Sequence, residues 1–414
     1  MKSESSVNTE YVLRVAWAAH RGVGENTGSE AGNYMRGLLP PEHFIMVDSR
    51  PDIILFMSGG SERRAIEQTE PGHPVLLLSI RGNNAYAAAT EVMAWMVNHN
   101  RIALLSDAAD ASESGLTERW RRAAGVWHHL KGKRAGLIGA VSEWLVASDV
   151  SAETLRKRFG VNLTGIPWAG LPDYSREDPD SALLQRFAGH KATGLDEAAR
   201  VLTLLRRVIS ENNLSAVGVE CFSLVQQHKV TACLALAQLN NEGSVAACEG
   251  DLASMAGMMA GQAAAGIVPW MANTTRLTGE TLILSHCTIA FDLAREIKLL
   301  THFETDSSLA VDGQLTASEV TLFRFSDSLD RALIAEGKVV SRPRLANACR
   351  TQVEIELPEN KLKILRGKPL GNHLLVLPGK HSVLLSLACF YKGMREIEYD
   401  ISPEEGKSIV LYGD

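Results

Sequence analysis

The sequence lacks several patterns that mark common classes of protein. None of its six cysteines forms a CxxC pair, which argues against a structural zinc knuckle. Acidic residues outnumber basic ones, 48 against 42, and the formal charge of −6 argues against a general nucleic-acid binder, although it leaves room for a local basic patch. The first ten residues are polar and contain no apolar core, so no secretory signal is expected. We therefore expect a cytoplasmic protein with reduced, buried thiols.

Long uncharged runs are scarce, and one of them imitates a membrane span. Residues 252–271 have no charge, and Gly257 and Gly261 stand there at GxxxG spacing. The run is rich in Ala, Gly and Met rather than Leu and Ile, and Pro269 interrupts its end. No basic flank follows closely enough to anchor it. We interpret the run as a helix buried in a protein core and expect no membrane partner.

The composition is that of a globular protein with more than one domain. The chain has 414 residues, of which 45% are hydrophobic and 22% charged. Strand-like and helical runs alternate up to about residue 290, which predicts parallel sheets covered by helices. After that point short β-rich runs predict an antiparallel sheet or barrel. We expect an N-terminal α/β domain at 1–130, a central α/β domain at 131–290 and a β-rich domain at 291–414.

Polar residues in apolar surroundings concentrate between residues 220 and 373. Glu249 and Asp251 follow a strand and open a helix, where the helix dipole favours carboxylates. His302 and Glu304 are expected on one face of an extended stretch, 301–304. Two further histidines, His286 and His373, stand at strand ends. Carboxylates and imidazoles from several strand ends can form an octahedral site, and mixed oxygen and nitrogen ligands suit Mn²⁺ better than zinc.

Each of these residues also has a purely structural interpretation. A histidine at a strand end often serves only as a hydrogen-bonding residue, and Asp251 is placed to cap a helix. Glu249 is harder to explain in this way, because an unpaired carboxylate in an apolar run is costly. Trp144 either stacks on a sugar face or packs in the core. No dinucleotide-binding fingerprint accompanies the α/β pattern, which argues against a nucleotide-dependent enzyme.

The run Ala247-Cys248-Glu249-Gly250-Asp251-Leu252 is the most specific motif in the chain. Further landmarks follow one another in order at 133–139, 142–145, 220–224, 233–236, 270–273, 286–288, 302–304, 349–352 and 371–373. With these motifs the chain resembles the L-fucose/L-arabinose isomerase-like superfamily, specifically its shorter fucose-isomerase-like members. The resemblance covers about residues 130–385.

The resemblance implies a fold, an assembly and a metal. It implies two Rossmann-like α/β domains followed by a C-terminal β-barrel-like domain, in trimers or hexamers with sites near subunit contacts. It also implies aldose–ketose interconversion with Mn²⁺ held by Glu249, by a carboxylate on the next strand and by His373. This chain has Asn273 at the second position, which can ligate through its carbonyl but cannot exchange a proton. It also has Glu220 and Ser223 where a basic residue and an aspartate are usual.

Our main hypothesis is an aldose–ketose isomerase that acts on a sugar or sugar derivative through a metal-assisted enediol. Glu249, Asn273 and His373 would hold the metal, Glu249 could act as a base, and Glu220 or Asp251 could replace the missing acid. The expected sugar contacts are Trp144, His286, His302, Glu304 and Asn372. The alternatives are a non-catalytic sugar-binding or regulatory protein on the same scaffold, and a lyase or epimerase using the same enediol.

Overall fold

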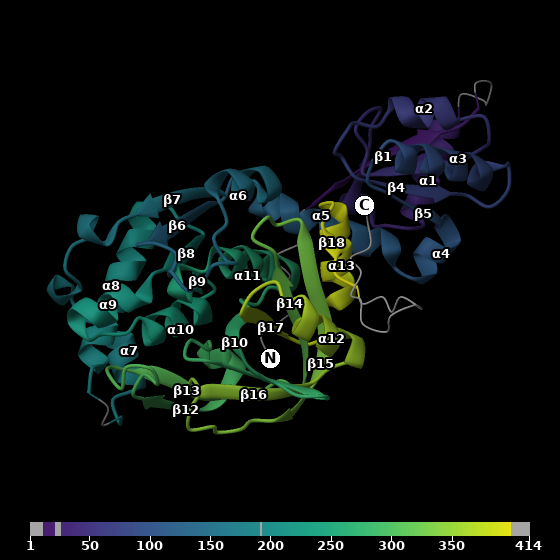
Figure 1. Ribbon diagram of the computed structural model, residues 1–414. Helices are drawn as coiled ribbons and strands as arrows, with labels where there is room; N and C mark the ends of the chain where they lie inside the picture. Colours follow the sequence, from purple (N-terminus) through teal and green to yellow (C-terminus); the bar gives the residue numbers. More distant parts are fainter. Residues whose placement is uncertain (1–10, 21–25, 191–192, 399–414) are drawn as a thin grey trace. The chain divides into compact units, whose positions relative to one another are not determined.

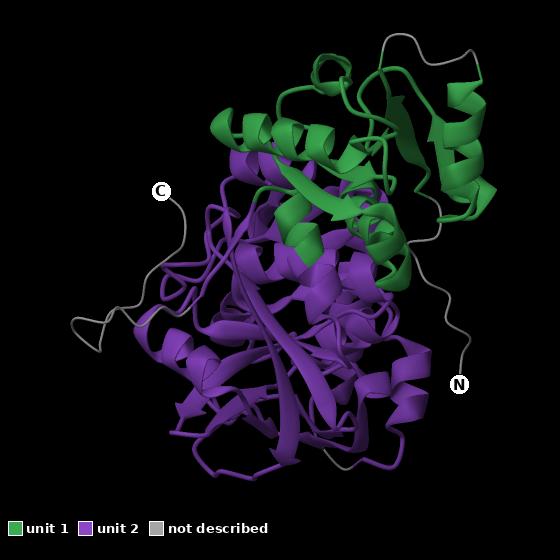
Figure 2. Ribbon diagram, turned by 90° about the vertical axis from the view of Figure 1, so that its right-hand side faces the viewer, with its two compact units in different colours: residues 1–128, 387–393 green, residues 129–386, 394–414 purple. Residues whose placement is uncertain are grey.

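The computed structural model describes residues 11–20, 26–190 and 193–398 (Figure 1). The first ten residues, on which the expectation of no secretory signal rests, lie outside this part. Two compact units divide the chain (Figure 2). One comprises residues 1–128 and 387–393, and the other comprises residues 129–386 and 394–414.

The first unit is built on a five-stranded parallel sheet with strand order β2-β1-β3-β4-β5. Its strands are β1 (Leu13–Ala18), β2 (Phe44–Met46), β3 (Ile53–Phe56), β4 (Val75–Ser79) and β5 (Ala103–Asp107). All of β3 and β4 is buried, as expected for strands with helices on both faces. The helices are α1 (Thr27–Arg36), α2 (Glu62–Glu67), α3 (Ala85–Asn98), α4 (Ala108–Glu113) and α5 (Leu116–Leu130), which leads into the second unit.

The second unit begins with a four-stranded parallel sheet of order β7-β6-β8-β9. The strands are β6 (Arg134–Ile138), β7 (Asn162–Ile166), β8 (Ala216–Val219) and β9 (Val245–Ala247). Its helices are α6 (Ala152–Phe159), α7 (Ser181–Arg186), α8 (Leu195–Glu211), α9 (Cys221–His228), α10 (Cys233–Asn241) and α11 (Leu252–Ala265). The strand that follows β6, β7, lies on one side of it, and the next strand, β8, lies on the other. A crevice is expected at the carboxyl ends of the strands where the order reverses in this way.

Six antiparallel strands of the same unit close into a barrel, because β14 pairs with both β17 and β15. They are β10 (Trp270–Leu277), β11 (Thr281–His286), β14 (Glu319–Phe325), β15 (Arg331–Ser341), β16 (Thr351–Glu356) and β17 (His373–Pro378). The short strand β18 (Arg395–Glu396) lies beside β15, and β12 (Ala294–Leu300) pairs with β13 (Ala310–Leu315). The remaining helices are α12 (Glu359–Gly367) and α13 (Ser382–Tyr391).

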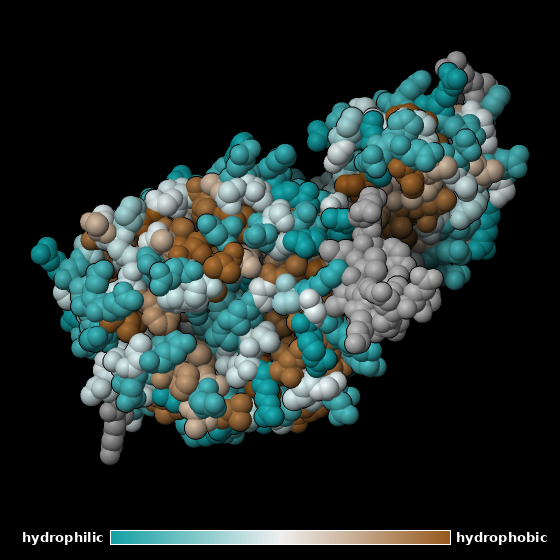
Figure 3. Space-filling model, viewed as in Figure 1, coloured by the Kyte–Doolittle hydropathy of each residue, from teal (hydrophilic) through white to brown (hydrophobic). Residues whose placement is uncertain are grey.

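Helix α11 lies between the parallel sheet and the barrel, in contact with β9, β14 and β17 (Figure 1). It begins at the N-cap Asp251 and ends at Gly266, which adopts the left-handed conformation typical of a helix end. Its 14 residues span only about 21 Å. No helix in the described part of the chain is both long and apolar enough to cross a bilayer. Hydrophilic residues cover most of the face in Figure 3, with hydrophobic ones in small separate areas.

The fold class expected from the sequence is confirmed: two parallel α/β sheets precede a C-terminal antiparallel barrel. The barrel begins earlier than the change in sequence texture suggested, because β10 and β11 precede residue 291. The prediction of an extended stretch at 301–304 is wrong. This segment turns back after β12, with backbone hydrogen bonds from Asp306 to His302 and from His302 to Ser307.

Candidate metal and sugar site

The candidate site lies at the carboxyl ends of the central parallel strands. Trp144 follows β6, Glu220 follows β8 and Glu249 follows β9, so one sheet edge brings the three together. Glu249 lies in a short turn, Cys248–Gly250, and has a backbone φ of +59°. A glutamate rarely adopts this left-handed conformation, and such strain is common at functional sites.

Two histidines from the barrel complete a cluster around the Glu249 carboxylate. Its Oε1 lies 3.7 Å from Nε2 of His286, at the end of β11, and 3.6 Å from Nε2 of His373, at the start of β17. One ligand atom from each of the three residues lies within 4.8 Å of the other two. Donor atoms around a single ion, each bound at about 2.0–2.3 Å, are separated by comparable distances. The three residues could therefore hold a metal ion.

The burial of the two imidazoles supports this interpretation. The side chains of His286 and His373 are 4% and 0% exposed, and that of Glu249 is 12% exposed. Neither Nε2 atom has a hydrogen-bond partner. A buried polar atom without a partner is costly, and a cation between the rings and the carboxylate would satisfy both atoms at once.

The charges of the cluster follow from its contacts. Burial alone would favour a neutral Glu249, but the two histidines hold the pKa of its carboxyl well below the usual range. Burial lowers the pKa of His286. For His373 burial acts in the same direction, yet contacts with Asp251 and Glu249 outweigh it and raise the pKa to about 9. The negative charges of Asp251 and Glu249, which favour a protonated His373 ring, would favour a bound cation in the same way.

Asp251 lies against His373 among other buried polar groups. Its side chain is fully buried, and its oxygens accept hydrogen bonds from Ser254, Arg324 and His373. Burial favours the neutral form, but the charge of Arg324 and the contact with His373 keep the pKa of Asp251 well below its usual range. The sequence suggested Asp251 as a proton donor to the substrate. The structure shows its carboxylate bonded to Ser254, Arg324 and His373, and the catalytic role stays a prediction.

Glu220, the other candidate acid, forms a hydrogen bond with the loop after β6. Its Oε2 accepts the backbone N–H of Ala140 at 2.9 Å, and its carbonyl oxygen accepts the indole N–H of Trp168. A side chain at Gly139 would collide with this carboxylate, since a Cβ there would lie 2.1 Å from Oε2. The structure therefore gives Glu220 a local structural partner on the same sheet edge as Glu249.

Asn273 and Asn372 lie beside the cluster. Asn273 on β10 pairs with His373 on one side and with Ser285 on the other, so its side chain leaves the sheet on the same face as theirs. Its amide oxygen accepts a hydrogen bond from the side chain of Asn372, which is exposed. A direct Asn273–metal contact remains a prediction.

Aromatic rings form a wall next to the carboxylate. The indole N–H of Trp144 donates to Oε2 of Glu249 at 2.7 Å, while the residue as a whole is 47% exposed. Phe222 packs edge-on against Trp144, with ring centres 4.8 Å apart, and His302 lies 5.9 Å from Phe222. The indole N–H of Trp144 is thus held at the site, while much of its ring surface is in solvent. This arrangement suits stacking on a sugar.

The turn after β12 adds a carboxyl group to this wall. Glu304 lies 3.9 Å from His302, with its side chain 48% exposed. Burial, together with the negative charge of Glu249, raises the pKa of Glu304. Burial lowers the pKa of His302 to about 4, so its ring is neutral near pH 7.

Sequence reasoning found most of these residues but not all of their positions. His286 was expected to contact the sugar, and the structure places it in the candidate ligand set. Phe222 and Arg324 were not singled out. A possible signal for Arg324 was its position between Phe323 and Phe325 in an apolar strand, where an arginine needs buried partners.

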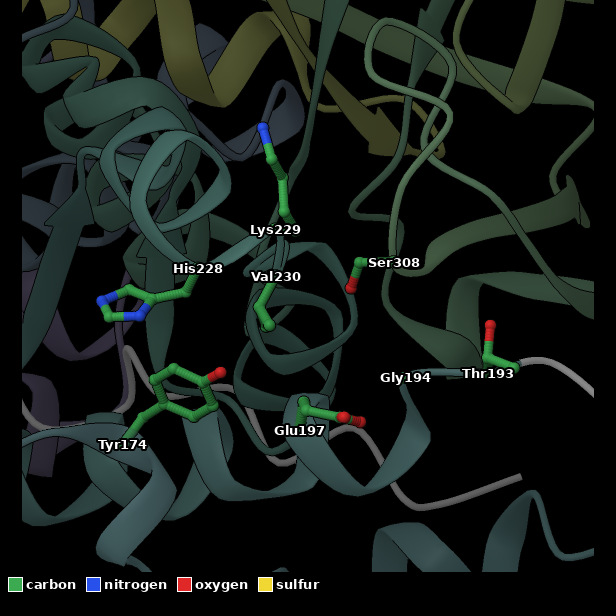
Figure 4. A pocket seen from close by; sticks show the side chains of 8 residues that line it. All are labelled: Tyr174, Thr193, Gly194, Glu197, His228, Lys229, Val230 and Ser308. Carbon is green, nitrogen blue, oxygen red and sulfur yellow. The ribbon is translucent and has the colours of Figure 1, made fainter.

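A separate cavity of about 280 Å³ lies at the far end of α9 (Figure 4). Its lining includes Tyr174, Glu197, His228 and Ser308. Tyr174, Glu197 and Ser308 direct oxygen atoms into it. None of its lining residues belongs to the Glu249 cluster, so this cavity is distinct from the candidate metal site.

The fold and the cluster together define a class: parallel α/β sheets joined to an antiparallel barrel, with a carboxylate–histidine site. The chain is distantly homologous to sulfoquinovose isomerases. It is 28% identical to that of Alkalicoccus urumqiensis over 189 residues, which cover 43% of this chain and 40% of the relative. It is 26% identical to those of Priestia aryabhattai and Priestia megaterium over 270 residues, 60% of each chain. The matches thus span 40% to 60% of the relatives' length. No family model matches the chain.

Proposed function

We propose that the chain is an aldose–ketose isomerase for a sugar or sugar derivative, with a divalent metal held by Glu249, His286 and His373. The observation behind the proposal is the convergence of one ionised carboxylate and two buried imidazoles whose Nε2 atoms have no hydrogen-bond partner. Distant homology to sulfoquinovose isomerases supports the same activity.

The ligand set leaves room for a substrate. Three protein ligands leave coordination positions open, as in catalytic metal sites. A divalent metal bound there supplies polarisation of a sugar carbonyl and the neighbouring hydroxyl. We propose Mn²⁺, with Asn273 as an additional weak ligand through its amide oxygen. Zinc is the competing ion, because it also binds two histidines and a glutamate.

The residues around the ligands can orient the sugar and move its protons. The exposed ring of Trp144 would stack on the apolar face of the sugar. Proton transfer between adjacent carbons needs a base and an acid. We assign the base to Glu249. Glu304 is the better acid, because it is half-exposed and its pKa is raised, whereas Asp251 is buried and its pKa is lowered. Asn372, exposed beside Asn273, would contact a sugar hydroxyl.

The experiment combines metal analysis with an isomerisation assay. The purified protein is stripped with a chelator, reloaded separately with Mn²⁺ and with Zn²⁺, and its bound metal is measured. Each form is then incubated with sulfoquinovose and with several neutral aldoses in D₂O. We expect one metal per chain, formation of a ketose, and deuterium at the carbon next to the carbonyl. Failure of both metal binding and conversion across this panel would refute the proposal. Sedimentation of the same sample tests the trimer or hexamer that we also propose.

The competing function is a non-catalytic sugar-binding protein, favoured by Asn273, which lacks the charge of a carboxylate ligand. Asn273→Asp separates the two, because an anionic oxygen attracts a dication more strongly than an amide does. For an isomerase we expect tighter Mn²⁺ binding and slower turnover, since the added charge would disturb a site adapted to an amide. A wild type that binds sugar without metal or conversion, and a variant that gains metal binding alone, would favour the sugar-binding protein.

A further inference from the structure

A buried arginine connects the barrel to the candidate ligand set. Arg324 lies on β14 and is completely buried. Its guanidinium donates to Oδ2 of Asp251 at 2.9 Å, to the hydroxyl of Ser254 at 2.6 Å and to the hydroxyl of Ser148 at 2.7 Å. A buried guanidinium is tolerated only with such partners. All of them belong to the parallel-sheet part of the second unit, so Arg324 ties that part to the barrel.

Asp251 passes this constraint to a histidine. It caps α11 by accepting the backbone N–H of Ser254 through Oδ1 at 2.6 Å. Its other oxygen, Oδ2, accepts from Arg324 and also lies 2.8 Å from Nδ1 of His373. Because this partner is an ionised carboxylate, Nδ1 of His373 must hold a hydrogen. The Nε2 atom of the same ring is thereby directed to Glu249, 3.6 Å away.

We propose that Arg324 and Asp251 are positioning residues for metal binding, which act through His373 and not on the substrate. Asp251 fixes the ring of His373 in the orientation and tautomer that present Nε2 to the metal, and Arg324 fixes Asp251. Carboxylates that accept the second N–H of a ligating histidine have this effect in metal sites generally. The inference rests on the proposed metal at Glu249, His286 and His373.

The backbone before His373 is fitted to the same arginine. A Cβ at Gly371 would lie 2.7 Å from Nη2 of Arg324 and 2.9 Å from its central carbon. The chain therefore enters β17 in direct packing against the guanidinium. Arg324 is thus linked to His373 indirectly in two ways, through Asp251 and through packing against the backbone two residues earlier.

Asp251→Asn tests the proposal with little change to the fold. Asparagine caps helices about as well as aspartate, so its amide oxygen can still accept from Ser254. Its amide group would then face two other donors, Arg324 and Nδ1 of His373. His373 would lose its acceptor, and its hydrogen could move to Nε2, where it blocks the metal. We expect Mn²⁺ affinity, measured by EPR of the free ion, to fall about tenfold to a hundredfold.

The ¹⁵N NMR shifts of His373 are a second measurement, because they report which ring nitrogen carries the hydrogen. A purely structural role of Asp251 would leave these shifts unchanged. In the wild type at high pH we expect hydrogen on Nδ1, and in Asp251→Asn on Nε2. Thr321→Val is the matched control, because Thr321 is fully buried on the same strand and its hydroxyl bonds to Gly379 and His381, away from the ligand set. The control should lose stability but bind Mn²⁺ like the wild type.

The outcomes separate this inference from the proposed function. If the wild type binds neither Mn²⁺ nor Zn²⁺, the metal proposal itself fails and this inference with it. If the wild type binds and Asp251→Asn binds within about twofold, the positioning role is refuted while the metal site stands. Equal losses in Asp251→Asn and Thr321→Val also refute it, because general destabilisation would explain both. If Asp251→Asn does not fold, Arg324→Lys replaces it, and we expect a smaller loss because lysine keeps the charge without the planar fork.

Discussion

Glu249 is the residue on which the candidate site depends most. Its positive φ is followed by another at Gly250, and a Cβ at Gly250 would lie 2.3 Å from the carbonyl oxygen of Ala140. Two successive left-handed residues make a turn too tight for most sequences. The turn directs the Glu249 carboxylate toward His286 and His373, and we attribute its backbone strain to this function.

Glu249→Gln should abolish metal binding and turnover. The substitution keeps the shape of the side chain but removes its negative charge. The charged carboxylate attracts the dication and can accept a proton, and the amide does neither as well. We expect Mn²⁺ affinity to fall at least a hundredfold, on the order of 3 kcal/mol or more. Titration of metal-free protein with Mn²⁺ followed by EPR measures this loss.

Trp144→Phe is the matched control for Glu249→Gln. It keeps an aromatic ring but removes the N–H that donates to Oε2 of Glu249. Metal affinity should then fall less than in Glu249→Gln, because the carboxylate keeps its charge and loses only one hydrogen bond, of the kind to a charged group that contributes about 1.5–3 kcal/mol. A Glu249→Gln protein that still binds Mn²⁺ as tightly as Trp144→Phe would show that the cluster is not the metal site.

The sequence identified these residues unequally, for physical reasons. Glu249 could be singled out because a carboxylate in an apolar run needs a partner. The position of His286 could not, because its approach to Glu249 depends on how the barrel strand β11 packs on the parallel sheet. Asp251 is a helix cap in the sequence pattern, and its second role appears only once Arg324, 73 residues away, reaches the same oxygen.

Helix α11 owes its position to its glycines. A Cβ at Gly261 would lie 2.5 Å from Pro269 and 2.8 Å from Phe323, and one at Gly257 would lie 2.4 Å from Leu375. At Gly261 the rigid rings of Pro269 and Phe323 leave no room for a methyl group, whereas at Gly257 the end of the Leu375 side chain would have to shift. Since Asp251 caps the same helix, this packing also sets the distance between Asp251 and the barrel.

Gly261→Ala should destabilise the second unit. In an open helix this change stabilises by about 0.5–1 kcal/mol, but overpacking against Pro269 and Phe323 costs about 1–3 kcal/mol. Gly32→Ala in α1 is the matched control, because nothing lies within 4 Å of a Cβ there, and we expect it to be neutral or stabilising. Urea unfolding of both variants tests the contrast. Equal effects would show that the close approach of α11 is not tight.

At the level of elements, local pattern predicted more than long-range pairing. The buried strands of the parallel sheets and the helix now seen at Leu252–Ala265 follow from apolar runs and turn residues. The closure of the barrel cannot be predicted from such local patterns, because β10 pairs with β17 across about a hundred residues of sequence. Nor can the turn after β12, where Asp306 and Ser308 adopt positive φ values that their residue types do not demand.

The last residues of α13 belong to the first unit, although they lie near the end of the sequence. Tyr391 donates to the fully buried Asp52 at 3.0 Å, and Tyr11 donates to the same carboxylate. Trp127 donates to the carbonyl of Ala388 at 2.7 Å. All these contacts lie within the first unit, whereas every candidate ligand lies in the second. Metal binding, or a substitution of a candidate ligand, should therefore change the stability of the second unit and leave that of the first unchanged.

The metal-free protein should lose stability as pH rises from about 6.5 to 9. The pKa of His373 is raised from 6.5 to about 9 in the folded state, so its contribution is complete below 6.5 and lost as pH passes 9. His286 acts in the opposite direction and only at the start of this window, because its pKa is lowered in the folded state while the unfolded residue still loses protons near 6.5. We expect a loss of about 1–3 kcal/mol in urea unfolding with chelator present. His373→Gln should flatten the slope, and an unchanged slope would contradict the assignment.

Metal binding should stabilise the second unit alone. A ligand at a hundred times its Kd adds about 2.7 kcal/mol to the state that binds it. Hydrogen exchange can locate this gain, because Glu249 follows β9, His286 ends β11 and His373 begins β17. With Mn²⁺ we expect slower exchange in these strands and in α11, whose cap Asp251 bonds to His373. Exchange in β1, β3 and β4 should stay the same, and Glu249→Gln should show no response anywhere. Protection spread over both units, or protection that persists in Glu249→Gln, would place the metal elsewhere.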